Sequence, residues 1–321
     1  MRLKKEINKL KDAIINMGDN ASSIPIDVKS NELSDLKIVF EKHIGRVLSS
    51  KKDAVRKNKE YEQFLADSRV MQSERIVARQ IQMSMLPGSV PDFGVAERID
   101  LFADMDAADE TGGDFYDYFK IDDDHICFEI ADVEGKGIPA AMYMAVAKTL
   151  IRLRLESGEA LSAVLSSVNR QLCLSSMQRR FITLWVGVLE ISTGKLTYVN
   201  AGHNYPVLKR GGEAAELVKN SSGIPIASYF SKKRPLPEYT EFELQLKSGD
   251  VLFLYTDGIT EAMNVNNLTF GDNKLLELTD MYLQSPHTMR DFTAYIKRQV
   301  LAFTNSPNQN DDITTLALRY N

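Results

Sequence analysis

Residues 128–139 read FEIADVEGKGIP, in which an apolar strand runs directly into an acid and then into a glycine-containing turn. Asp132 stands at the end of the apolar run. Pro139 suits the first turn of a helix, which residues 140–155 would continue with an apolar face. The stretch therefore predicts a strand, a turn and a helix, with Asp132 beside the helix start as the first candidate functional residue.

Three further segments place an aspartate at a strand end or beside a glycine-containing turn. Asp114 lies within ETGGDFYDYF (110–119), Asp257 follows the apolar run of LFLYTDGITEA, and Asp311 precedes the strand of NDDITTLAL. One Asp-Gly turn is weak evidence, because most such turns lie at the surface. Carboxylates at the ends of several central strands would converge on one spot, where they repel one another unless a cation lies between them. Oxygen ligands without a His or Cys partner select Mg²⁺ or Mn²⁺ over zinc.

From Pro87 onward the chain shows short β runs separated by turns, with helices in pairs. Helices are expected at about 138–156 and 160–177, and again at about 272–284 and 288–303. Strands in runs and helices in pairs favour an α+β fold, in which helices cover a sheet sandwich, over a parallel βαβ sheet. The candidate strands lie near 98–103, 115–120, 125–131, 181–190, 195–200, 206–210, 241–246, 250–256 and 313–319.

The first 86 residues carry a helical pattern instead. An extended connector is expected at 21–30, and a second amphipathic helix starts at about Glu32. The first helix has a coiled-coil seam spaced 4, 3, 4, 3, formed by Leu3, Ile7, Leu10, Ile14 and Met17.

Helix, connector and helix together resemble a HAMP signalling unit, which would be a parallel dimeric four-helix bundle. A plain dimerising coiled coil is the alternative. We therefore expect a HAMP-like dimerisation segment at 1–50, a helical linker at 51–86 that Pro87 and Gly88 end, and a main domain at 87–321.

Charge divides the chain at the same boundary. Residues 1–86 carry a net charge of +5, and the remainder carries −10. An acidic main domain disfavours nucleic acid as a partner and suits a protein that gathers carboxylates around a cation. No apolar run approaches the roughly 20 residues of a membrane span and no signal peptide opens the chain, so a cytoplasmic location is expected. A HAMP-like start also allows for an upstream membrane sensor that this chain does not contain.

The order GGDFYD, ADVEGKG, YTDGITEA and DDIT resembles the PPM-type metal-dependent protein phosphatases, in their bacterial SpoIIE/RsbU-like branch. The resemblance covers about residues 78–320 and includes ARQIQMSMLP before the domain and SSGIPIA after its middle. It implies an αββα sandwich and a serine/threonine protein phosphatase of bacterial signalling. It also implies a phosphorylated STAS-domain regulator as the substrate.

The resemblance assigns a role to each acid. Asp132 would bridge two Mn²⁺ or Mg²⁺ ions, and Asp257 and Asp311 would complete the first metal site. Asp114 and the carbonyl of Val133 would hold the second ion. A water between the ions would attack phosphorus in line, which makes Asp132 and Asp114 the candidate catalytic residues.

Other conspicuous residues have a structural interpretation. Asp117 is expected to be an outward acid on its strand, His203 to stabilise a turn, and Asp312 to cap a strand. Glu134 stands where eukaryotic members carry a histidine, so the group that protonates the leaving oxygen is unassigned. No arginine lies near the motifs, and the basic loop 230–239 is a candidate substrate contact.

Two other functions stay open on the residues alone. Gly112, Gly113 and Asp114 also suggest a diguanylate cyclase, but that family needs a second acid where this chain has Phe115. A phosphatase fold that only binds partners is the other alternative, and the presence of all four aspartates argues against it.

Activity could also depend on the N-terminal segment. In the family that the chain resembles, helices flanking the core act as an activation switch driven by an upstream dimeric linker. Our hypothesis is that rearrangement of a homodimer through residues 1–86 completes the metal site.

Overall fold

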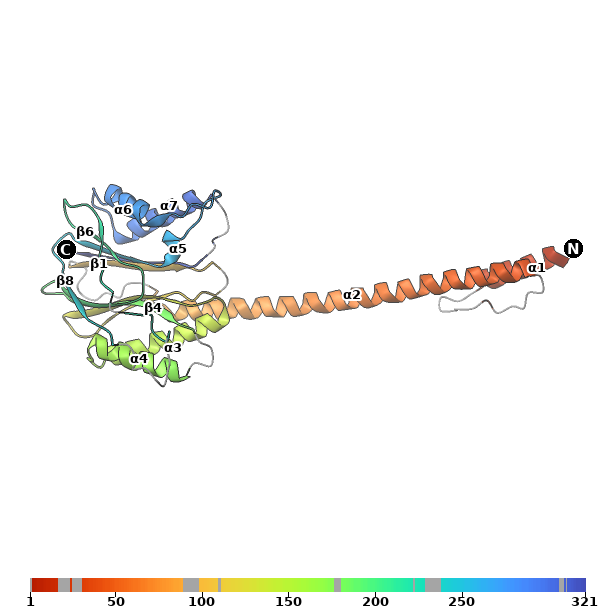
Figure 1. The fold of residues 1–321 in the computed structure, drawn as a ribbon, viewed down its shortest axis with the longest axis horizontal. Helices are drawn as coiled ribbons and strands as arrows, with labels where there is room; N and C mark the ends of the chain where they lie inside the picture. The colour runs from red at the N-terminus through yellow and green to blue at the C-terminus, as the bar shows by residue number, and fades with distance from the viewer. Residues whose placement is uncertain are drawn as a thin grey trace. The chain divides into compact units, whose positions relative to one another are not determined.

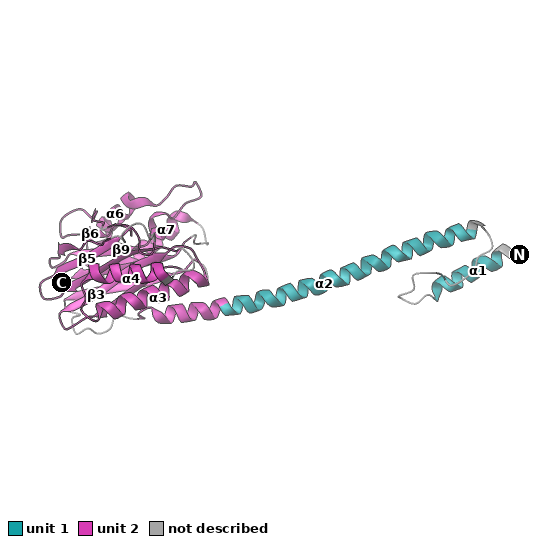
Figure 2. Cartoon of the chain, turned by 60° about the horizontal axis from the view of Figure 1, so that its bottom comes forward, with its two compact units in different colours: residues 1–74 teal, residues 75–321 magenta. Residues whose placement is uncertain are grey.

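The chain forms two compact units, residues 1–74 and 75–321, shown in two colours in Figure 2. The computed structural model describes residues 2–16, 24, 31–88, 98–108, 111–175, 180–221, 223–228, 238–305, 309 and 311–321.

The first unit is helical. Helix α1 covers Arg2–Ile15, and helix α2 runs without a break over Asn31–Met85, so the expected second helix and linker form one element. The last turns of α2 belong to the second unit. Most of the expected connector at 21–30 lies outside the described residues. A small buried cluster holds the unit together and contains Leu10, Ile24 and Leu33.

Helix α2 exposes apolar side chains along much of its length. Val39 is 63% exposed and Phe64 is 65% exposed, where a helix packed on its own chain would bury them. Within the described residues, no helix is both long and apolar enough to cross a bilayer.

The second unit contains two antiparallel sheets of five strands each. Sheet A has the order β1-β10-β9-β6-β7, and sheet B has the order β2-β3-β4-β5-β8. The strands are β1 Ile99–Asp106, β2 Phe115–Lys120, β3 His125–Val133, β4 Ile182–Glu190, β5 Lys195–Ala201, β6 Val207–Lys209, β7 Glu216–Leu217, β8 Phe242–Gln245, β9 Val251–Tyr255 and β10 Ile313–Tyr320.

Two helices cover the outer face of each sheet (Figure 1). Helices α3 (Ile138–Leu155) and α4 (Leu161–Ser175) pack on sheet B, and α6 (Gly271–Tyr282) and α7 (Met289–Thr304) pack on sheet A. The expected αββα sandwich is confirmed. One short helix, α5 (Asp257–Thr260), was not expected, because its sequence had the pattern of a turn.

Strand β9 shows how the layers are built. All five of its residues are buried, and successive side chains face opposite sides of a strand. Leu252 and Leu254 join the core between the two sheets, whereas Phe253 and Tyr255 join the cluster beneath α6 and α7. A strand buried on both faces is therefore uniformly apolar, as the sequence VLFLY is.

The core between the sheets includes an aromatic stack on sheet B. The chain's single tryptophan, Trp185 on β4, lies between Phe128 and Tyr198, with ring centroids 5.4 Å and 5.3 Å away. Such stacks add to the stabilisation that comes from burial alone.

Candidate metal centre

Asp132 lies at the junction that the sequence predicted. Strand β3 ends at Val133, one residue after Asp132, and helix α3 begins at Ile138. Gly135 and Gly137 between them have φ values of 92° and 78°, which side chains rarely adopt, so the turn depends on glycine at both positions. Asp132 is thereby fixed between a central strand of sheet B and the start of a covering helix.

Asp114 connects the two sheets at one end of the sandwich. It precedes β2 of sheet B and is 2% exposed. Its Oδ2 accepts hydrogen bonds from the Oγ1 atoms of Thr256 and Thr314, at 2.7 Å and 2.6 Å. Thr256 follows β9 and Thr314 lies in β10, so both hydroxyls come from sheet A.

The glycines of the motifs allow backbone segments to touch around this point. A Cβ atom on Gly113 would lie 2.4 Å from the carbonyl oxygen of Val133. A Cβ atom on Gly258 would lie 1.9 Å from the carbonyl oxygen of Asp312. A real Cβ atom cannot lie so close to another atom, so glycine at these two positions allows the four motifs to pack together.

Asp312 has a different task from the one expected. Its carboxylate accepts hydrogen bonds from the amides of Ala108 and Gly113, at 2.8 Å and 2.9 Å. These residues lie some 200 positions earlier in the chain. Asp312 therefore anchors the segment before Asp114, and the interpretation that it caps its own strand was wrong.

Gln82 is a site-region residue that the sequence did not reveal. It lies in the last turn of α2, is 3% exposed, and hydrogen-bonds through both side-chain polar atoms to the backbone of Gly112. The only signal for this residue in the sequence was the motif ARQIQMSMLP, which is part of the resemblance to the family. Nothing in its pattern distinguished Gln82 from its neighbour Gln80.

The four aspartates lie within one another's electrostatic field. Burial, Asp257 and Asp311 raise the pKa of Asp132 to about 7. Burial, Asp311 and Glu261 raise the pKa of Asp257 to about 6. The pKa of Asp114 is raised well above its ordinary value by burial and by Asp132 and Asp312. The structure thus brings all four predicted carboxylates together, and burial and neighbouring acids disfavour the charged forms of Asp114, Asp132 and Asp257.

These groups fit a hard divalent cation. All donors are oxygens, and the Val133 carbonyl faces the same region through its contact with Gly113. Among the described residues, no three such side chains already surround a single cation position. Binding would therefore require the carboxylates to adjust, and relief of their repulsion would favour it.

Two cationic side chains lie at the motifs that carry the carboxylates. Lys136 places its Nζ atom 3.0 Å from Oδ1 of Asp311. Arg180 donates from Nη1 to the carbonyl oxygen of Glu134 and lies against Gly135. The expectation that no arginine is near the motifs was therefore wrong, because the start of β4 brings Arg180 to them from 46 residues away.

Asp117 was expected to point outward, and this was also wrong. It is fully buried between β2 and helix α3, where its Oδ2 lies 2.7 Å from Lys148 Nζ and 3.3 Å from Arg152 Nη1. Glu129 pairs with Asp117 across β2 and β3 and is also fully buried. Burial and Asp117 raise the pKa of Glu129 well above its ordinary value, and its oxygens have no hydrogen-bond partner among the described residues. The cluster ties α3 to the sheet that carries Asp132.

His203 has the structural role that was expected. Its amide donates to Oδ1 of Asn200 at 2.8 Å, and its carbonyl accepts from Nδ2 of the same residue at 3.1 Å. The ring Nδ1 lies 2.8 Å from Oγ1 of Thr183, which pairs with Asp132 across β3 and β4. Burial lowers the pKa of His203 to about 4, so the ring is neutral at pH 7.

Comparisons with known proteins agree with this geometry. Residues 122–321 match the family model described as Stage II sporulation protein E (SpoIIE). Protein IcfG of Synechocystis sp. is 29% identical over 272 residues, which is 76% of this chain and 41% of IcfG. The phosphoserine phosphatase RsbU of Bacillus subtilis is 29% identical over 198 residues, which is 61% of this chain and 56% of RsbU. The chain therefore spans about half the length of these two relatives.

A solved structure gives the same fold. The SiaA-PP2C domain of Pseudomonas aeruginosa superposes with a TM-score of 0.66 at 18% identity. The match covers 80% of this chain and 99% of that domain.

Proposed function

Because this chain belongs to the SpoIIE family, we propose that residues 75–321 are a metal-dependent phosphatase that hydrolyses phosphoserine or phosphothreonine on a protein. The observation that carries the proposal is the convergence of Asp114, Asp132, Asp257 and Asp311 from four separate segments. Burial and repulsion from Asp257 and Asp311 raise the pKa of Asp132 to about 7, and a bound cation would relieve that repulsion. Neither the fold nor the family supports the diguanylate cyclase alternative.

Two ions, Mn²⁺ or Mg²⁺, would bind between these carboxylates. Asp132 would bridge them, Asp257 and Asp311 would complete one site, and Asp114 with the Val133 carbonyl would complete the other. Bound there, the ions would acidify a water for attack on phosphorus and neutralise the phosphoryl oxygens.

The chain's own groups prepare the site for a phosphoryl dianion. Thr256 and Thr314 fix the Asp114 carboxylate, so its orientation does not depend on substrate. Lys136 adds positive charge beside Asp311, and Arg180 adds it at the turn that follows Asp132, where a doubly negative group must approach an acidic domain. The loss of either charge would weaken phosphate binding without removing a metal ligand.

The substrate we propose is a phosphorylated STAS-domain regulator in the cytoplasm. The relative RsbU is named a phosphoserine phosphatase, and this name suggests that the substrate is a protein that carries phosphoserine. The test is incubation of the full chain with Mn²⁺ and a phosphoserine STAS-domain protein, with Asp132→Ala beside the wild type. Asp123→Ala is a matched control, because that aspartate is fully exposed on a turn.

Three results are informative. Phosphate release by wild type and Asp123→Ala, but not by Asp132→Ala, supports the phosphatase. Binding of the phosphoprotein without release supports a phosphatase fold that only binds partners. Release by all three proteins contradicts the proposed site.

We also propose that residues 1–86 form a HAMP-like homodimer that controls the phosphatase. The exposed apolar side chains of α2, such as Val39 and Phe64, support a second copy as the partner. Replacing residues 1–69 with a dimeric coiled coil in each of seven helical phases tests the control. Activity that varies with phase supports it, and equal activity in every phase contradicts it.

A further inference from the structure

A cavity of about 260 Å³ opens beside the carboxylates, between helices α5 and α7. One wall comes from the end of α7 and includes Leu301 and Thr304. The opposite wall is the segment that follows α5, which includes Ala262. Strand β10 contributes Ile313 to the lining.

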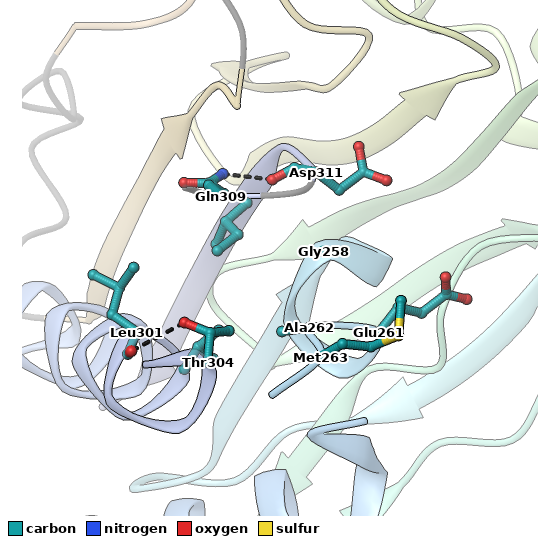
Figure 3. A pocket seen from close by; sticks show the side chains of 10 residues that line it. Gly258, Glu261, Ala262, Met263, Leu301, Thr304, Gln309 and Asp311 are labelled. Atoms are coloured by element: carbon teal, nitrogen blue, oxygen red, sulfur yellow. Dashed lines mark hydrogen bonds between the residues drawn. The ribbon is translucent and has the colours of Figure 1, made fainter. Parts of the chain in front are cut away.

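The cavity shares residues with the candidate metal centre. Asp311 is both a proposed ligand and a lining residue, and Gly258 directly follows the proposed ligand Asp257. Glu261 also lines the cavity and is one of the groups that raise the pKa of Asp257. Figure 3 shows Asp311 and Glu261 with their carboxylates directed to the same side, away from Leu301 and Thr304. Anything bound at the carboxylates and extending over Asp311 therefore meets the cavity.

The lining is suited to an apolar group. Alongside Ala262 and Ile313, the side chains of Met263, Val300 and Leu301 face the cavity. The hydroxyl of Thr304 is used locally, because its Oγ1 donates to the carbonyl of Leu301 at 3.0 Å. Leu301 is 50% exposed and Met263 is 46% exposed, so a bound group would cover apolar surface that now faces water.

We propose that this cavity receives an apolar side chain of the phosphoprotein substrate, from a residue close in sequence to the phosphorylated serine. The inference rests on the proposed phosphatase function and adds a determinant of substrate choice to it. A phosphorylated residue at the carboxylates leaves its neighbours in the chain a few ångströms away, because consecutive Cα atoms are about 3.8 Å apart. The cavity edge at Asp311 lies within that reach, since Asp311 belongs to both sites.

The expected size of the preference for a peptide with an apolar side chain follows from the burial of one aliphatic side chain. Covering a leucine contributes enough free energy for about a tenfold change in kcat/KM when the cavity is partly open. An aryl phosphate such as p-nitrophenyl phosphate has no peptide to place in the cavity. Its hydrolysis therefore reports on the metal centre alone.

The experiment uses the full chain, Mn²⁺ and a set of synthetic phosphoserine peptides. Each peptide carries one leucine at one of the three positions on either side of the phosphoserine, in a background of serine and glycine. The variants are Leu301→Gln, which makes the exposed wall polar, and Ala262→Leu, which narrows the cavity. Met281→Gln is the matched control, because Met281 is 57% exposed near the end of α6 and does not line the cavity.

We expect wild type and Met281→Gln to cleave one of the leucine peptides about tenfold faster than the unsubstituted peptide. Leu301→Gln and Ala262→Leu should lose this preference and keep wild-type hydrolysis of p-nitrophenyl phosphate. Intact hydrolysis of p-nitrophenyl phosphate without a leucine preference, or a preference that both variants retain, overturns the inference alone. No release from any peptide or from p-nitrophenyl phosphate overturns the proposed function and, with it, the inference.

Discussion

The side chain of Gln82 is hydrogen-bonded at both ends to a single residue, Gly112. Nε2 of Gln82 donates to the Gly112 carbonyl at 2.8 Å, and Oε1 accepts from the Gly112 amide at 3.2 Å. Gly112 lies two residues before Asp114, and the amide of the next residue, Gly113, donates a hydrogen bond to the Asp312 carboxylate. The last turn of α2 and the segment that carries Asp114 therefore move together or separate at the cost of two buried hydrogen bonds.

Gln82→Ala should loosen the segment that carries Asp114. Removing a buried side chain that satisfies a backbone amide and carbonyl costs about 1–3 kcal/mol of unfolding free energy. We expect that loss in denaturant unfolding of the full chain, together with faster hydrogen exchange at residues 111–114. Gln80→Ala is the control, because Gln80 is exposed on the same helix. Equal exchange in both variants would show that the contact does not hold the segment.

Gly258→Ala should disturb the candidate metal centre through the backbone. The new Cβ atom would lie 1.9 Å from the Asp312 carbonyl, so the segment carrying Asp311 must move away. We expect a loss of at least about 1–3 kcal/mol in unfolding free energy and a weaker stabilisation by Mn²⁺, both measurable by thermal unfolding. Gly211→Ala is the control, since a Cβ atom there meets nothing within 4 Å. Unchanged Mn²⁺ stabilisation in Gly258→Ala would contradict the assignment of Asp311.

Lys148→Met should destabilise the contact between α3 and sheet B. It leaves the buried Asp117 carboxylate with only the half-exposed Arg152, and breaking a buried pair typically costs about 3 kcal/mol or more. Lys195→Met is the control, because its pair with Glu243 is exposed and surface pairs contribute little. The double variant Asp117→Asn/Lys148→Met should recover part of the loss in urea unfolding. If the double variant is no more stable than Lys148→Met, the lysine acts through packing rather than charge.

The metal-free protein should lose stability as the pH rises from 4 to 8. The folded-state pKa values of Asp132 and Asp257, about 7 and about 6, lie above the ordinary value of 3.8. The folded state therefore binds more protons than the unfolded state in this window, and the unfolding free energy falls as those protons leave.

The difference between wild type and Asp132→Asn isolates this effect from other titrating groups. In EDTA at pH 8 we expect Asp132→Asn to be more stable than wild type, on the order of 2 kcal/mol, with little difference at pH 4. Asp123→Asn should match wild type at both values, because that carboxylate is exposed. A wild-type protein as stable as Asp132→Asn at pH 8 would show that burial and the neighbouring carboxylates do not raise the pKa of Asp132.

Much of the fold and the site could be predicted from local pattern. Asp132 follows an apolar strand and precedes a proline-led helix, and the structure builds that junction between β3 and α3. The αββα layers follow from runs of strands and pairs of helices. These features depend on residues that are neighbours in the chain, so periodicity and turn chemistry report them.

The sequence could not show the contacts between residues that lie far apart in the chain. Asp117 stands in a strand of alternating appearance, yet the covering helix supplies Lys148 and makes the position buried. Arg180 and Gln82 come to the motifs from segments with no recognisable chemistry of their own. Each of these contacts depends on how the layers pack against one another, and local sequence patterns do not contain that information.

The buried stack around Trp185 makes this protein optically simple. With one tryptophan in the chain, 1% exposed on β4, fluorescence excited where only tryptophan absorbs arises from sheet B alone. The 55-residue helix α2 contributes strongly to far-ultraviolet circular dichroism but carries no indole. Tryptophan emission and ellipticity, followed together during heating, would therefore separate melting of sheet B from unwinding of the long helix without any label.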